Sequence, residues 1–311
     1  MKKYIRLLGN ALMILSIIFL VFRVRNMDIS WGGLLEADHL ITIVLCIFLY
    51  SLLILISYYP WMTLVGLVTS RQNTFGGSKK EFLRVFTKSN IMKYIPGNVF
   101  QYVGRNEIAT VLCLPHIQVA AATVVEMVLM ASGAGALSVL LLGSYTFRYF
   151  YSRLGPYLYL IALICILAGV VLCFLFHGRL KNYFTNNLSG VRKKSFFGGI
   201  VFCFFFYIMA FFYGGALFIA VLKVCGAVEL TLQSLKLLLG TYSLSWMAGY
   251  ITPGAPGGMG IREIIMTTVL GGDRFIADDV IIQASILFRL VTVLGDLIAF
   301  LFAQLFFGIR R

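Results

Sequence analysis

Arg105 and Arg262 each stand nine residues after a proline that is followed by glycine, and both lie in otherwise apolar sequence. Proline lacks an amide donor and glycine permits unusual backbone angles, so neither stretch can be a continuous helix. A guanidinium beside the free amides of a helix start is well matched to a phosphate group. The candidate anion-binding residues are Arg105, Arg262, Pro96, Gly97, Asn98, Pro253, Gly254, Gly257, Gly258, Gly260 and Glu263.

The second of these breaks divides two short apolar segments, 240–251 and 261–270. We expect two half-helices, the second with Arg262 in its first turn and its amides directed into a cavity. At membrane depth such irregular backbone is tolerated only where it is buried in protein or lines a wet cavity. Two alternatives stay open: a plain helix-breaking turn at the membrane surface, and a structural Arg262 that holds the loop through a carboxylate such as Glu263.

Three further charges, Glu126, Arg289 and Asp296, lie well inside apolar spans. Each costs roughly 2.5–3.5 kcal/mol at the bilayer centre on insertion scales, so each should face protein or water. Arg289 and Asp296 are seven residues apart, on one helix face. We expect Glu126 and Arg289 to interact, either as a structural ion pair between the two halves of the chain or as direct participants in transport.

The elements that position these residues follow from a composition that is 60% hydrophobic and 12% charged, typical of an integral membrane protein. The predicted fold is an all-α polytopic membrane protein with about six full spans and two Pro-Gly re-entrant segments, eight if the re-entrants are counted. The first apolar run also fits a signal peptide, but no small-residue cleavage site follows it. The expected spans are 7–22, 40–70, 117–143, 156–176, 196–222 and 280–309.

The two Pro-Gly motifs, at Pro96 and Pro253, are offset by 157 residues, and the same shift places three apolar spans on three others. The chain is therefore a single membrane domain, 1–311, with repeat units at 1–143 and 156–311. Sixteen basic residues fall in predicted cytoplasmic segments and six in outer ones, which places both termini in the cytoplasm. The units then have opposite topology, and inverted repeats with broken helices are a transporter architecture.

The basic, partly apolar stretch 79–88 is read either as an interfacial helix or as an ordinary cytoplasmic loop. Six scattered cysteines and three separated histidines show no metal-ligand spacing, so no metal is expected. The sequence also shows no catalytic constellation and no nucleotide-binding motif, and we expect neither enzymatic activity nor a cofactor.

The motif at 253–263, the segment 94–97 with Arg105, and the charges Glu126 and Arg289 together resemble the membrane domain of the lysylphosphatidylglycerol synthase/flippase family. This resemblance implies a multi-pass protein of the plasma (inner) membrane that moves lipids with polar heads between leaflets. Some members carry a soluble aminoacyl-transferase domain after the membrane part. Since this chain ends at Arg311 without one, we expect no synthesis of aminoacylated lipid. The inserted Ala255-Pro256 departs from the plainer form of the motif.

The leading functional hypothesis is a flippase-like transporter for a lipid with an anionic, phosphate-containing head group, such as a phospholipid or a polyprenyl-phosphate-linked glycolipid. The alternative is an anion channel or transporter, which would need a closed polar pore rather than a cavity open to lipid. A third hypothesis is an accessory protein of a cell-envelope glycolipid pathway. Candidate partners are membrane lipids, a lipid-modifying or glycosyltransferase enzyme and a second copy of the chain, but no nucleic acid.

Overall fold

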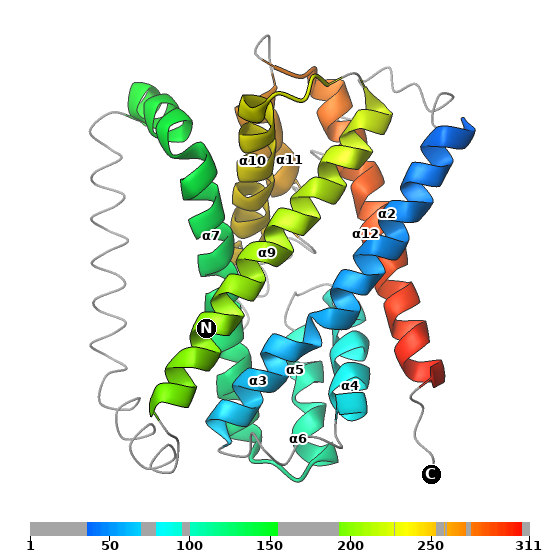
Figure 1. The fold of residues 1–311 in the computed structure, drawn as a ribbon, viewed down its shortest axis with the longest axis vertical. Coiled ribbons are helices and arrows are strands. Elements are labelled where there is room, and N and C mark those ends of the chain that lie inside the picture. Colours follow the sequence, from blue (N-terminus) through cyan, green and yellow to red (C-terminus); the bar gives the residue numbers. More distant parts are fainter. Residues whose placement is uncertain are drawn as a thin grey trace, which may run out of the picture.

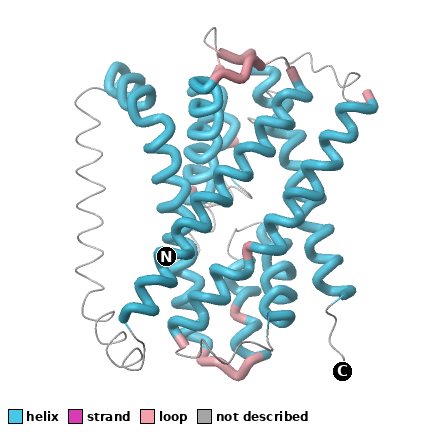
Figure 2. The backbone as a smooth tube through the Cα atoms, viewed as in Figure 1, coloured by secondary structure: helices cyan, strands magenta, loops and turns pink. Residues whose placement is uncertain are grey.

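The computed structural model describes residues 36–69, 79–94, 100–154, 193–226, 228–252, 258, 260–271 and 275–306. Within these ranges every regular element is a helix (Figures 1 and 2), which confirms the predicted all-α class. The elements are α2 (Ala37–Ile56), α3 (Tyr58–Val68), α4 (Lys79–Ile91), the 3₁₀ helix η3 (Met92–Tyr94), α5 (Phe100–Arg105), α6 (Glu107–Val111), α7 (His116–Leu154), α9 (Lys193–Cys225), α10 (Leu232–Ile251), α11 (Ile261–Leu270) and α12 (Asp278–Phe306).

Four described helical stretches are long and apolar enough to cross a membrane. They are Ala37–Val68, His116–Gly143, Phe197–Cys225 and Asp278–Phe306. Each coincides with a span expected from the sequence. The other two expected spans, 7–22 and 156–176, lie outside the described residues, so the total number of spans stays a prediction.

The surface of the bundle is apolar while several charges are buried inside it. Leu140, Phe197 and Leu305 are 75%, 71% and 77% exposed, whereas Glu126 and Asp296 are each 1% exposed. In water, so many large exposed hydrophobic side chains would form costly patches. In a bilayer the same faces contact lipid tails, and the charges are held away from hydrocarbon.

The first long apolar run is a helix pair, α2 and α3, which meet at Ser57. Pro60 stands in the first turn of α3 and has no amide to donate to the preceding turn, so the helix is interrupted there. The Ser57 amide bonds back to the carbonyls of Leu53 and Ile54, which closes α2. The apolar run 40–70 is thus two helices, with the break at Ser57, just before Pro60.

Helix α4 lies within the bundle rather than on a membrane surface. Its apolar residues Phe82 and Phe86 are 0% and 3% exposed and pack around Trp61 of α3, with ring centroids at 5.3 and 6.1 Å. The interpretation of 79–88 as an interfacial helix is therefore wrong. The periodicity correctly indicates an amphipathic helix, but its apolar face contacts protein instead of lipid.

Helices α10 and α11 are the two half-helices expected around the second break. Helix α10 begins at Leu232 because Thr231 and Ser234 form a reciprocal cap, in which each hydroxyl accepts from the other residue's amide at 3.1 and 2.8 Å. Helix α11 begins after Gly260, whose φ of 83° suits glycine. Figure 1 shows α10 and α11 in the upper half of the bundle, and α4, α5 and α6 in the lower half.

The packing of the long helices follows a paired pattern. The contact between α2 and α12 has a counterpart in the contact between α9 and α7. Likewise, the contact between α4 and α12 has a counterpart in the contact between α10 and α7. Glycines allow some of these close approaches. A Cβ added to Gly240 of α10 would lie 2.5 Å from Leu142 Cγ, and one added to Gly295 of α12 would lie 3.1 Å from the Ile47 carbonyl. Small residues at such contacts are typical of membrane helix pairs.

Candidate functional site

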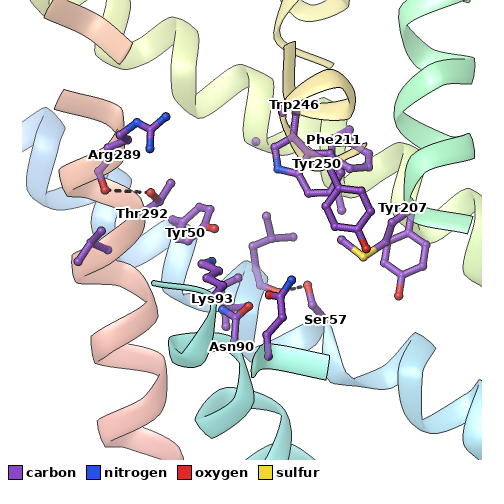
Figure 3. Close-up of a pocket in the computed structure, with 18 of the residues that line it drawn as sticks. Tyr50, Ser57, Asn90, Lys93, Tyr207, Phe211, Trp246, Tyr250, Arg289 and Thr292 are labelled. Carbon is purple, nitrogen blue, oxygen red and sulfur yellow. Dashed lines mark hydrogen bonds between the residues drawn. The ribbon is translucent and has the colours of Figure 1, made fainter. Parts of the chain in front are cut away.

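A cavity of about 380 Å³ lies inside the bundle, with walls from α2, α4, η3, α5, α7, α9, α10, α11 and α12. The helices beside the first Pro-Gly break (η3 and α5) and those beside the second (α10 and α11) contribute to it, and we call these pairs the first and second broken segments. All four long apolar stretches contribute as well. Figure 3 shows Tyr207, Phe211, Trp246 and Tyr250 gathered on one side and Arg289 on the other. Ligand pockets in proteins range from about 300 to 1,000 Å³, so this one holds a small molecule or a lipid head group, not a whole lipid.

Arg105 of α5 forms a buried ion pair with Glu126 of α7. The guanidinium also lies over the ring of Phe86, with its central carbon 4.6 Å from the centroid. The other oxygen of Glu126 accepts a hydrogen bond of 2.8 Å from the Tyr207 hydroxyl of α9. Arg105 thus lines the cavity, but its charge is already compensated by Glu126.

Arg289 of α12 pairs with Glu263 of α11, with Nη2 3.0 Å from Oε1. The same oxygen accepts from the Ser285 hydroxyl at 2.9 Å, and Oε2 accepts from the Gly260 amide at 2.7 Å. Glu263 therefore caps its own helix, so the Gly260 amide is not free for an anion as the sequence suggested. The expected ion pair between Glu126 and Arg289 is wrong, because Glu126 pairs with Arg105 and Arg289 pairs with Glu263.

Asp296 of α12 is the acceptor for three donors from α4 and η3. Lys93 Nζ lies 2.6 Å from one oxygen, Asn90 Nδ2 lies 2.6 Å from the other, and the Tyr94 hydroxyl also donates. Lys93, Asn90 and Tyr94 line the cavity. This cluster ties the first broken segment to the last long helix. The sequence indicates that Asp296 lies at membrane depth but does not identify its partners, although Lys93-Tyr94 directly precedes the first Pro-Gly break.

Arg262 is the exception among the four basic residues of the cavity wall. The other three each have a carboxylate within ion-pair distance, whereas the described residues offer Arg262 none. Its Nε is buried and has no hydrogen-bond partner there. Its guanidinium lies over the Trp246 ring, 5.6 Å from the centroid. The alternative in which Glu263 neutralises Arg262 is not what the structure has, since Glu263 bonds to Arg289.

Two glycines make room for the Arg262 side chain. A Cβ added to Gly249 would lie 3.0 Å from Arg262 Cγ, and one added to Gly258 would lie 2.9 Å from its Nε. The same Gly258 Cβ would lie 2.8 Å from Gly249 Cα, and the φ of Gly258 is 72°. Gly249 and Gly258 thus form a slot that aims the guanidinium at Trp246 and the cavity.

Several predicted site residues cannot be placed. Gly258 and Gly260 are described, and both have positive φ. The remaining break residues, namely Pro96, Gly97, Asn98, Pro253, Gly254 and Gly257, lie outside the described residues. Their proposed contact with an anion stays a prediction.

An aromatic wall on one side of the cavity was not predicted. Trp246 stacks on Tyr250 with ring centroids at 4.7 Å, and Phe211 meets Trp246 edge-on at 4.5 Å. The Tyr250 hydroxyl accepts a 2.8 Å hydrogen bond from Tyr102 of α5, which connects the two broken segments. The signal was present in the i, i+4 spacing of Trp246 and Tyr250 just before the second break.

Among the described residues, no group of three or more His, Cys, Asp or Glu is placed to hold a metal ion. The described residues instead give the cavity wall three cations that are paired with carboxylates and one guanidinium, that of Arg262, that is not. This arrangement is chemically suited to an anion, because a phosphate oxygen can supply the acceptor that Arg262 lacks.

Comparison of the chain with protein-family models, with curated proteins and with solved structures found no match.

Proposed function

We propose that this chain is a flippase-like transporter that moves a lipid with an anionic, phosphate-containing head group between leaflets. The observation that carries the proposal is Arg262, a cation without a carboxylate partner among the described residues, held by a glycine slot against a cavity inside a membrane bundle. A buried charge is costly when unpaired. A ligand that supplies the missing negative charge removes that cost.

The arrangement of the helices supports an inverted repeat. Ala37–Val68 and Lys193–Cys225 start 156 residues apart and end 157 apart, close to the offset between the two Pro-Gly motifs. The contacts of α12 with α2 and of α7 with α9 correspond under this shift, as do those of α4 with α12 and of α10 with α7. The two broken segments lie in opposite halves of the bundle in Figure 1. Transporters of this architecture bind substrate where the repeats meet.

The cavity wall favours a lipid over a free inorganic ion. Leu53, Met130 and Phe288 give it extensive apolar surface. Val293 belongs to the wall and is also 39% exposed, next to Leu294, which is 44% exposed on α12. A cavity that reaches the lipid-facing side of a helix suits a substrate whose tails stay in the bilayer, whereas an anion channel needs a closed polar pore.

The cellular setting belongs to the same proposal. The distribution of basic residues supports a multi-pass protein of the plasma membrane with both termini in the cytoplasm. The sequence contains no Walker-type nucleotide-binding motif, and we propose that net transport depends on a gradient or on an enzyme that supplies or consumes the lipid. A lipid-modifying or glycosyltransferase enzyme is therefore the proposed partner. A transporter that supplies such an enzyme with lipid would also be an accessory protein of a glycolipid pathway.

The test is lipid movement by the purified full chain in vesicles. Fluorescent phosphatidylglycerol placed in both leaflets is bleached from outside, and the fraction that becomes accessible reports its movement. A halide-sensitive dye in parallel vesicles reports ion flux. Lipid movement above protein-free vesicles, without halide flux, is expected. Halide flux without lipid movement would establish the channel instead, and neither activity would remove the proposal.

A further inference from the structure

The charges of the described residues around the cavity leave an excess of one positive charge. Its basic residues are Lys93, Arg105, Arg262 and Arg289, and their carboxylate partners are Asp296, Glu126 and Glu263. Each carboxylate is at most 1% exposed and bonded to two or more donors. The described part of the cavity therefore presents a single uncompensated cation, at Arg262.

We propose that the cavity selects a head group with one negative charge, which makes the substrate a phosphodiester lipid rather than a phosphomonoester or a diphosphate. This inference rests on the proposed lipid transport and names its substrate class. A phosphodiester carries one charge, whereas a phosphomonoester carries about 1.5–2 at pH 7. In a cavity of low dielectric, a second negative charge would have no partner and would also compete for the paired arginines.

The neutral groups of the wall indicate what accompanies the phosphate. Six tyrosines line the cavity, namely Tyr50, Tyr94, Tyr102, Tyr207, Tyr242 and Tyr250. Ser57, Gln101 and Thr292 add further uncharged donors and acceptors. Such a wall can satisfy hydroxyl groups, but its described residues provide no spare carboxylate for an ammonium. The head group is therefore best matched by a phosphodiester that bears a sugar or another polyol.

The experiment compares lipids with identical acyl chains that differ only in head-group charge. The full chain in detergent is titrated with phosphatidylglycerol, phosphatidic acid or diacylglycerol pyrophosphate, and binding is measured by the rise in melting temperature. We expect phosphatidylglycerol to bind at least about tenfold more tightly than either of the others. The readout is a ratio within one protein, so a general change of stability does not alter it.

Variants connect the ratio to Arg262. Arg262→Gln should bring the three affinities close together, because the excess charge is gone. Arg262→Lys keeps the charge and should keep the preference at lower affinity. Lys88→Gln is the matched control, since it removes one cation from an exposed ion pair with Glu107 outside the cavity wall and should leave the ratio unchanged.

Equal or tighter binding of phosphatidic acid or of the pyrophosphate by the natural protein would overturn the inference, as would an unchanged preference in Arg262→Gln or the absence of any lipid binding. These results are separable from the proposed function. Lipid movement without a preference for head-group charge would support the proposed transport and contradict only the phosphodiester selectivity. A clear binding preference for phosphatidylglycerol without lipid movement would support the phosphodiester selectivity and contradict the proposed transport.

Discussion

Lys93 and Asp296, which lie 203 residues apart in the sequence, form an ion pair of 2.6 Å between η3 and α12. Arg289 stands on the same helix, two turns before Asp296, and is paired with Glu263 of α11. Helix α12 therefore forms one ion pair with each of the two broken segments. If the broken segments move during transport, these two ion pairs are among the contacts of α12 that must rearrange.

Asp296→Asn should lower the free energy of unfolding by about 3–5 kcal/mol, because it leaves the Lys93 ammonium inside the bundle without a partner. Tyr94→Phe removes one hydrogen bond to the same carboxylate and should cost less, about 1.5–3 kcal/mol. Denaturant unfolding in detergent measures both. A loss below 1 kcal/mol for Asp296→Asn would mean that the pair is solvated and does not hold α12 to η3.

A double-mutant cycle on Arg105 and Glu126 tests the pairing that replaces the one expected from the sequence. Arg105→Gln and Glu126→Gln should each cost about 3–5 kcal/mol, and the double variant should cost much less than their sum. The exposed pair of Lys88 and Glu107 is the control, with a coupling of about 0–1 kcal/mol.

A second cycle tests the competing possibility, an interaction between Glu126 and Arg289. A Glu126→Gln/Arg289→Gln cycle should give additive losses, since the two residues have separate partners, Arg105 and Glu263. A strong interaction energy in that cycle, with none between Arg105 and Glu126, would restore the original expectation and contradict the structure.

The glycine slot predicts a loss of function that depends on geometry rather than charge. Gly249→Ala should impair lipid movement more than it lowers stability. The new methyl group would lie 3.0 Å from Arg262 Cγ and 3.1 Å from Gly258 Cα, so both must give way slightly, and the Arg262 side chain then leaves its place against Trp246. Gly258→Ala should also lose stability, since its φ is positive and its Cβ would meet backbone.

The control for the slot is Gly143→Ala in α7, where an added Cβ has nothing within 4 Å. Alanine there should be neutral or stabilise by roughly 0.5–1 kcal/mol through helix propensity. Equal behaviour of Gly143→Ala and Gly249→Ala in both transport and melting would show that the close approach at Gly249 has no functional role.

The apolar pattern predicted where the long helices lie, because about 20 apolar residues are needed to cross a bilayer and few other structures use them. It also predicted α11 residue for residue, since Gly260 and the end of the apolar run delimit 261–270. Hydropathy gives depth but not the direction in which a side chain points around the helix axis. Glu126 and Arg289 are at a similar depth in the sequence pattern, which suggested a pair. In the structure Glu126 pairs with Arg105 and Arg289 pairs with Glu263, both from the broken segments.

The same limit explains the site residues that were missed. Asn90, Lys93 and Tyr94 converge on Asp296 only because the chain returns more than 200 residues later as α12. A buried carboxylate demands such partners, but the sequence does not say which segment supplies them. Arg262 was identified because its signal is local, a basic residue in the first turn after a break.

Arg262 therefore gives the sharpest separation of function from folding. Because no described residue forms an ion pair with it, Arg262→Gln breaks no ion pair and should leave accumulation and melting temperature nearly unchanged while abolishing lipid movement. Arg262→Lys should restore movement only in part, since an ammonium cannot reproduce the two parallel hydrogen bonds of a guanidinium to phosphate. Arg289→Gln is the contrasting variant, because it leaves Glu263 buried and unpaired and should lower stability by about 3–5 kcal/mol. Normal lipid movement by a stably folded Arg262→Gln protein would exclude the anion site, and a parallel loss of stability and movement would make Arg262 a structural residue.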